Sequence, residues 1–284
     1  MIQCPPEATP FSPHEDRSRS GYNYIENDCY KKSKIKTGHD FDLRLPAYSS
    51  IVKNEHSMIE RIIVGPFHTN TYIVTTGKKE CLVIDPGAEP ETILSRLEVL
   101  NVRPVAIVLT HGHIDHLSAC NGIRAKYDTD ALQIPVYLHE KDMHFLENDS
   151  ADRARSIFEP FGDEGLSAFD RLFDLRPGQV TSMRDGFVIP DTDLTVIHTP
   201  GHTEGSVTIY SDSLAMAWTG DTVFFKAIGR TDFAGGNDLT IEQSVRERIF
   251  ILPDETRLFP GHGPDTTVER EKSSNDFSVD HLMI

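Results

Sequence analysis

The feature that most constrains this sequence is a cluster of ionisable side chains at the end of a predicted buried strand. Val105–Leu109 is a continuous apolar run, typical of a strand covered on both faces. Within the next residues, 111–116, come His111, His113, Asp115 and His116. Imidazoles and carboxylates suit Zn²⁺ or Fe²⁺, which accept nitrogen and oxygen ligands. Residues two apart in an extended segment face the same way, so His111 and His113 could share one metal ion. Asp115 and His116 lie where the chain turns into a helix and could serve a second.

Three further side chains of the same kind also follow predicted strands. They are His202, Asp221 and His262, and each is directly preceded by glycine. Glycine permits the tight turns that bring the backbone close to a metal ion. Taken alone, the first cluster could equally be a solvated turn, but its recurrence after three more strands argues for a metal site. A fifth and weaker cluster is Asp85-Pro86-Gly87, a turn signal after a short apolar run.

Strands alternate with helices through most of the chain, which predicts one α/β domain with helices covering sheets. The predicted strands are Ile62–Val64, Tyr72–Val74, Cys81–Ile84, Val105–Leu109, Pro135–Leu138, Leu194–Ile197, Val207–Tyr210, Leu214–Trp218 and Leu258–Phe259. The predicted helices are Glu91–Leu100, Leu117–Tyr127 and Thr240–Ile251. Thr240 and Gln243 are expected to form a capping box at the start of the last helix. Residues 140–180 could form a helical insertion over the site.

The two ends of the chain differ in character. Residues 1–57 show weak apolar periodicity, and we expect an N-terminal extension that is disordered or loosely packed. Residues 58–284 form the expected folded domain. The net charge of −16 repels phosphate backbones and anionic membranes, so neither nucleic acid nor a membrane is the expected partner. The N-terminus lacks the apolar core of a secretory signal, and the four cysteines form no C-x-x-C pair, so we expect a cytoplasmic protein with reduced thiols.

The segment HGHIDH at residues 111–116 resembles the H-x-H-x-D-H signature of the metallo-β-lactamase superfamily. His202, Asp221 and His262 match the remaining ligands of that family in order. The resemblance covers residues 58–284 and implies a four-layer αββα sandwich with its site at the strand ends. Within the family, the stretches GDTVFFKAIGRTDFAGGN and LPDETRLFPGHGPDTTVEREKSSNDF resemble the glyoxalase II-like hydrolases, in particular the short bacterial type. That likeness implies hydrolysis of S-(2-hydroxyacyl)glutathione thioesters, which are small-molecule substrates.

The family pattern implies two divalent metal ions, expected to be Zn²⁺, with iron or manganese as alternatives. The first would be held by His111, His113 and His202. The second would be held by Asp115, His116 and His262, and Asp221 would bridge both. Asp115 and Asp221 are thus the carboxylates assigned to catalysis, Asp115 as a ligand and not as a separate base. Metal ions lower the pKa of bound water from ~15.7 towards ~7, so a metal-bound hydroxide could attack the thioester carbonyl at neutral pH.

Candidates for substrate binding are less defined. Lys226 and Arg230 follow Asp221 closely, and by the resemblance a basic residue there could meet a substrate carboxylate. The alternative is a structural Arg230 bonded to the backbone or to Asp232. His198 matches no family ligand and is expected to be a packed residue.

The main alternative function is that of a persulfide dioxygenase. Enzymes of that kind share the fold, the H-x-H-x-D-H signature and the GRTDF segment, and they use one iron ion. In this chain His111, His202 and Asp221 would hold it. The PGHG segment at residues 260–263 resembles the hydrolase pattern and favours the hydrolase. A non-catalytic metal protein, a nuclease and an exported β-lactamase fit the sequence less well, and the acyl group, the thiol carrier and the oligomeric state stay open.

Overall fold

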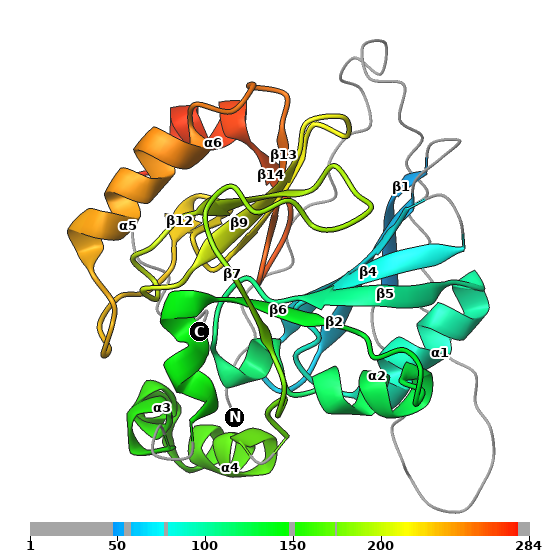
Figure 1. Cartoon of the computed structure of the whole chain (residues 1–284). Helices are drawn as coiled ribbons and strands as arrows, with labels where there is room; N and C mark the ends of the chain where they lie inside the picture. Colours follow the sequence, from blue (N-terminus) through cyan, green and yellow to red (C-terminus); the bar gives the residue numbers. More distant parts are fainter. Residues whose placement is uncertain (1–47, 54–57, 77–78, 148–150, 174, 278–284) are drawn as a thin grey trace, which may run out of the picture.

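The computed structural model describes residues 48–53, 58–76, 79–147, 151–173 and 175–277 (Figure 1). Its larger sheet has seven strands whose spatial order follows the sequence. They are β1 (Tyr48–Lys53), β2 (Met58–Val64), β3 (Thr69–Thr75), β4 (Glu80–Ile84), β5 (Arg103–Val108), β6 (Val136–His139) and β7 (Thr181–Met183). Strands β1 to β4 pair antiparallel, and β4 to β7 pair parallel.

The second sheet has the strand order β14-β13-β10-β9-β8. Its strands are β8 (Thr195–His198), β9 (Val207–Ser211), β10 (Met216–Gly220), β13 (Arg257–Pro260) and β14 (Thr266–Thr267). Strands β10 and β13 are parallel neighbours, so the segments that follow them leave the sheet at the same edge. A separate hairpin is formed by β11 (Val223–Phe224) and β12 (Ala227–Ile228).

The helices fall into two groups on opposite sides of the paired sheets (Figure 1). On the side of the larger sheet lie α1 (Pro90–Leu100), η1 (Ile114–His116), α2 (Cys120–Tyr127), η2 (Glu140–Leu146), α3 (Ala151–Phe158), η4 (Glu159–Phe161) and α4 (Gly162–Phe173). On the side of the smaller sheet lie α5 (Asp238–Ser244), the π-helical η5 (Val245–Ile249) and α6 (Val268–Ser274).

Side chains of both sheets interdigitate in the central core. Tyr72, Leu82 and Val108 of the larger sheet meet Trp218 and Phe259 of the smaller one. The Phe259 ring centroid lies 5.8 Å from those of Tyr72 and Trp218. Burial of each such side chain stabilises the fold by about 1.5–3 kcal/mol. The sheets therefore form the two inner layers of the molecule.

The outer layers are explained by the alternation of side chains along each strand. Ile73, the neighbour of Tyr72 on β3, points to the other face and packs with Ile93 and Leu97 of α1. On the smaller sheet a third core contains Ala217, Leu258, Ile241, Val245 and Ile249. The predicted four-layer αββα sandwich is confirmed.

Some predicted element ends are wrong, for local reasons. Helix α2 begins at Cys120 and not at Leu117, because Ile114–His116 first form a 3₁₀ turn. The expected capping box at Thr240 is absent. Asn237 caps α5 instead, and its side-chain oxygen accepts a hydrogen bond from the main-chain N–H of Thr240. The predicted helical character of the segment after residue 140 is confirmed by η2, α3, η4 and α4.

Part of the predicted N-terminal extension is described. Strand β1 pairs antiparallel with β2, from Tyr48 opposite Ile62 to Lys53 opposite Met58. Residues 1–47 and 54–57 lie outside the described residues, so the boundary between residues 57 and 58 stays a prediction.

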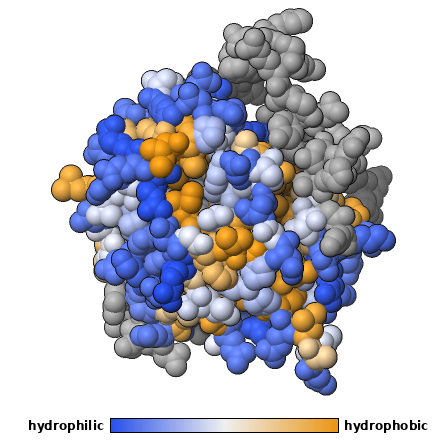
Figure 2. Space-filling model, turned by 45° about the horizontal axis from the view of Figure 1, so that its top comes forward, coloured by the Kyte–Doolittle hydropathy of each residue, from blue (hydrophilic) through white to orange (hydrophobic). Residues whose placement is uncertain are grey.

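Among the described residues, no helix combines the length and the apolar character needed to cross a bilayer. On the face drawn in Figure 2, hydrophilic side chains separate several smaller apolar patches.

Candidate metal centre

The predicted ligands converge where strands of the two sheets end. His111, His113, Asp115 and His116 follow β5, His202 follows β8, Asp221 follows β10 and His262 follows β13. An antiparallel bridge between Thr69 and His262 joins the two sheets at this edge. The ligand residues are buried, none more than 2% exposed. The structure thus brings all seven predicted metal ligands together.

Three imidazoles form the first set: His111, His113 and His202. Their candidate ligand atoms lie within 4.8 Å of one another. The Nε2 atom of His202 is 3.0 Å from Nδ1 of His113. Asp221 Oδ2 lies 3.5 Å from Nε2 of His202 and 4.0 Å from Nε2 of His111.

The second set consists of Asp115, His116 and His262, again within 4.8 Å of one another. Asp115 Oδ2 lies 3.4 Å from the Nε2 atoms of both histidines, which are 3.3 Å apart. The carboxylate of Asp221 also reaches this set, at 3.5 Å from Nε2 of His116 and 3.5 Å from Nε2 of His262. Asp221 therefore contacts both sets.

Hydrogen bonds on the outer side of the cluster fix the tautomers of two histidines. The Nδ1 atom of His202 lies 2.8 Å from the main-chain oxygen of Arg230, and Nδ1 of His262 lies 3.0 Å from that of Phe67. A carbonyl oxygen can only accept, so each Nδ1 must carry the hydrogen. In the neutral ring, Nε2 then presents a lone pair to the cluster, as a metal ligand does.

Asp85 extends this arrangement to two more histidines. Its carboxylate accepts hydrogen bonds from the main-chain N–H (2.7 Å) and the hydroxyl (2.6 Å) of Thr110, and it accepts one from Nδ1 of His116 at 3.0 Å. Because the Thr110 hydroxyl donates to Asp85, its oxygen accepts from Nδ1 of His111 at 3.1 Å. In their neutral forms, both rings therefore also turn an Nε2 lone pair inward.

The centre of the cluster holds acceptors without donors. His111 Nε2, Asp115 Oδ1 and both carboxylate oxygens of Asp221 are buried and have no hydrogen-bond partner. Such groups are costly to bury unless something compensates them, and cations coordinate lone pairs of this kind. The backbone of the turn before His262 also lies close to the carboxylate of Asp221, because a Cβ on Gly261 would be 2.1 Å from Asp221 Oδ1. The donor set thus fits divalent metal ions.

The electrostatics divide the histidines into two groups. Burial, together with neighbouring imidazoles, holds the pKa of His111 and His113 well below 6.5. Burial also lowers the pKa of His202. Burial acts in the same direction at His116 and His262, but nearby carboxylates outweigh it and raise their pKa. The negative charge that attracts a cation is therefore concentrated around the second set and Asp221.

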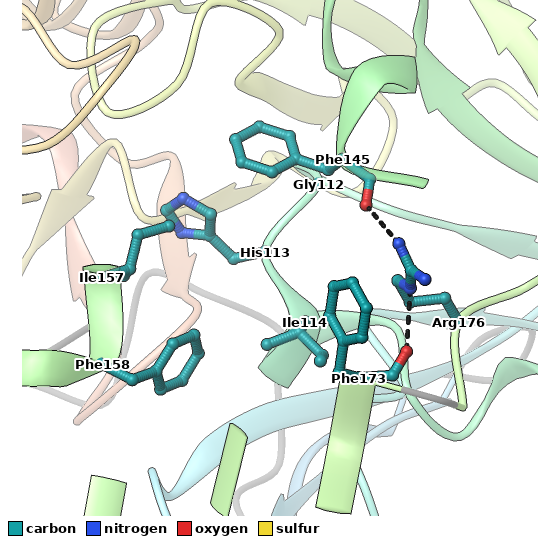
Figure 3. Close-up of a pocket in the computed structure, with 8 residues that line it drawn as sticks. All are labelled: Gly112, His113, Ile114, Phe145, Ile157, Phe158, Phe173 and Arg176. Atoms are coloured by element: carbon teal, nitrogen blue, oxygen red, sulfur yellow. Dashed lines mark hydrogen bonds between the residues drawn. The ribbon is translucent and has the colours of Figure 1, made fainter. Parts of the chain in front are cut away.

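An apolar wall covers the first set. The ring of Phe233 lies 5.1 Å from that of His113 and 5.2 Å from that of His202, and the Phe145 ring lies 5.3 Å from that of His113. Figure 3 shows Phe145, Ile157 and Phe158 arranged around the His113 ring. The cavity between them has a volume of about 10 Å³, about the room needed for one water molecule.

The two candidate substrate-binding residues have different positions. Arg230 is 3% exposed, and its guanidinium donates to both oxygens of Asp232, at 2.8 and 3.1 Å. This is the structural pairing that the sequence left open. Lys226 is exposed in the β11–β12 turn, and its main-chain N–H donates to Glu271 at 2.8 Å. No contact links its side chain to the ligand cluster within the described part of the chain.

His198 is packed, as predicted. Its ring stacks on that of His139 with centroids 4.3 Å apart, and its Nε2 donates to the main-chain oxygen of Glu204. The residue on which it stacks, His139, is 3% exposed.

Some side chains that organise the site have no signal in the sequence. Thr69 donates to Asp115 Oδ2 at 3.0 Å, and Asn70 donates to the main chain on both sides of the His262 turn. Asp142 binds two loops of the first set. Asp85 has a weak signal, since it belongs to a turn that follows a strand.

Comparison with known proteins agrees with this geometry. A family model described as the metallo-beta-lactamase superfamily matches residues 64–262. A probable metallo-hydrolase, YqgX of Bacillus subtilis, is 34% identical over 76% of this chain and 95% of its own. The hydroxyacylglutathione hydrolase GloC of Haemophilus influenzae is 33% identical over 77% of this chain and 97% of its own.

Solved structures give the same result. The B3 metallo-beta-lactamase BLEG-1 matches with a TM-score of 0.64 at 32% identity, over 77% of this chain and 98% of its own. TTHA1623, solved in a di-iron-bound form, matches with a TM-score of 0.64 at 33% identity, over 76% of this chain and 98% of its own.

Proposed function

The chain belongs to the metallo-beta-lactamase superfamily, and from this membership we propose that it is a two-metal hydrolase that cleaves a thioester such as an S-(2-hydroxyacyl)glutathione. The name of the similar GloC protein supports the thioester as substrate class.

One observation carries the two-metal part of the proposal, namely the complete second set. A mononuclear iron dioxygenase would need only His111, His202 and Asp221. Here Asp115 and His262 are also buried, and Asp115 Oδ2 lies 3.4 Å from the His262 Nε2 that faces it. Burying a carboxylate and an imidazole with no role in the site would cost free energy. Asp115 belongs to the signature that the dioxygenases share, so His262 is the residue that favours a hydrolase with two metal ions.

The contacts within each set of ligands indicate which residues would bind each metal ion. The first set would hold one ion and the second set the other, with Asp221 in contact with both. Two cations bound here would activate water at neutral pH and polarise the substrate carbonyl. The ligand set tolerates zinc, iron and manganese, and we propose zinc.

The chain itself contributes orientation and exclusion of water. Main-chain oxygens and Asp85 hold the rings of His116, His202 and His262 with their Nε2 atoms inward, so these rings need not reorient during turnover. Phe145 and Phe233 shield His113, which lowers the local dielectric and strengthens charge interactions inside the site. A thiolate is a good leaving group, so a thioester needs no dedicated protein acid.

We further propose that Arg230 contributes to binding a substrate carboxylate. Its side chain lies beside the Phe233 ring, with the guanidinium carbon 5.6 Å from the ring centroid, and Phe233 contacts two histidines of the first set. Because Asp232 occupies the guanidinium, a substrate carboxylate would replace it. Lys226, whose side chain is exposed in the β11–β12 turn, stays a proposed second candidate for this role.

The test is an assay of S-D-lactoylglutathione hydrolysis by the metal-loaded protein, with oxygen uptake on glutathione persulfide measured in parallel. Hydrolysis that is lost in His262→Ala supports the proposal. Oxygen uptake without hydrolysis, unchanged in His262→Ala, would replace it with the dioxygenase.

Arg230→Ala should raise KM for lactoylglutathione more than it lowers kcat, and equal KM in both proteins would remove Arg230 from substrate binding.

A further inference from the structure

A buried carboxylate outside the ligand set joins the loops of the first set. Asp142, in η2, is 0% exposed. Its Oδ2 accepts hydrogen bonds from the main-chain N–H of Gly112 (2.9 Å) and the hydroxyl of Thr203 (2.7 Å). Its Oδ1 accepts one from the main-chain N–H of Gly205 at 2.6 Å. A single side chain thus receives donors from two separate loops.

Two of these three donors lie next to a ligand in the chain. Gly112 separates His111 from His113, and Thr203 directly follows His202. The carboxylate therefore fixes the spacing between the loop after β5 and the loop after β8. These loops carry the whole first set.

The contact leaves little freedom for the two loops to move apart or slide. A Cβ on Gly205 would lie 2.5 Å from Asp142 Oδ1, and one on Gly112 would lie 2.5 Å from the Phe145 ring. Both loops therefore lie directly against η2. Asparagine could not replace Asp142 fully, because both oxygens of Asp142 accept hydrogen bonds. Asparagine has only one acceptor oxygen, and its NH₂ group would face an N–H or O–H donor to which it cannot bond.

The turn that carries His262 of the second set has a different support. The side chain of Asn70 donates to the main-chain oxygens of Pro260 and Gly263, both at 2.9 Å. Its main-chain N–H donates to the oxygen of Gly261 at 2.6 Å. These bonds enclose the turn that carries His262. No hydrogen bond found among the described residues joins Asn70 to the loops that Asp142 holds.

We propose that Asp142 is a positioning residue that sets the metal affinity of the first set, while Asn70 sets that of the second. The inference rests on the proposed two-metal function. It predicts that the two affinities can be changed separately, although Asp221 contacts both sets. Outer partners of metal ligands typically change metal affinity by about 10–100-fold when they are replaced.

The experiment measures Co²⁺ and Zn²⁺ binding to the metal-free full chain, with a competing chromophoric chelator. The Co²⁺ absorption spectra of His262→Ala and His113→Ala identify the signals of the first and second sets. Asp142→Asn should weaken the first set by about 10–100-fold and leave the second set unchanged. Asn70→Ala, a matched truncation of a buried polar side chain, should show the opposite pattern.

The outcomes separate this inference from the proposed function. If Asp142→Asn weakens both sets equally, or neither, the inference is wrong while the two-metal function stands. If the unmodified chain binds no metal ion, the proposed function fails and the inference with it. Thr203→Val, which removes one donor alone, covers the case in which Asp142→Asn does not fold. It should weaken the first set selectively, and an equal loss from both sets would contradict the inference.

Discussion

Replacing Gly261 with alanine should disable the site while leaving the fold largely intact. The new Cβ would lie 2.1 Å from Asp221 Oδ1 and 2.7 Å from Cε1 of His116. Real Cβ contacts are essentially never shorter than 3.0 Å, so the carboxylate or the turn must move by about 0.9 Å. Gly261 does not have a positive φ, so alanine adds no backbone strain.

The expected size of the effect follows from this displacement. A shift of about 1 Å in a catalytic group can lower activity by about 100-fold, or about 2.7 kcal/mol in transition-state free energy. Overpacking in a core costs about 1–3 kcal/mol of folding stability. Both quantities are measured for Gly261→Ala, as kcat/KM with metal content and as the free energy of unfolding.

The matched control is Gly178→Ala, because no atom lies within 4 Å of a Cβ at that position. It should keep activity, metal content and stability. Wild-type metal content and activity in Gly261→Ala would show that Asp221 does not occupy the centre of a metal site, and would refute the reasoning.

Three other predictions test the folded state. Asn237→Ala removes the N-cap of α5 and should lower the free energy of unfolding by about 1 kcal/mol in urea, with activity retained. Tyr72→Phe removes the buried 2.7 Å hydrogen bond to the Pro260 oxygen and should cost about 0.5–1.5 kcal/mol in the same assay, because Asn70 still donates to that oxygen. Burial and His198 lower the pKa of His139 from 6.5 to about 4, so the unfolded state binds more protons between these values. In chelator, the unfolding free energy should therefore fall as the pH drops from 6.5 towards 4, and His139→Phe should flatten this slope. An unchanged slope in that variant would assign the pH dependence to other groups.

Much of the fold and the candidate ligands could be predicted from the sequence because their signals are local. The alternation of apolar runs and turns predicts an α/β domain, and the family resemblance implies its four layers. The HGHIDH segment at the end of β5 places four candidate ligands in six residues. His202, Asp221 and His262 follow strands in the same way, so one rule located all of them.

The supports of the site could not be predicted, because their partners are distant in the chain. Asp142 accepts from Gly205, 63 positions away, through a main-chain N–H that any residue possesses. Asn70 reaches Pro260 across 190 positions. The start of α5 was misplaced for a related reason, since Asn237 and Thr240 are both good capping residues and tertiary contacts decided between them.

The most direct test of the two-metal account is the metal content of the purified protein beside that of His262→Ala. Metal analysis should give two ions per chain for the protein and one for the variant, since the variant loses a ligand of the second set only. One ion per chain in both proteins would contradict the account, because His262 would then hold no metal ion.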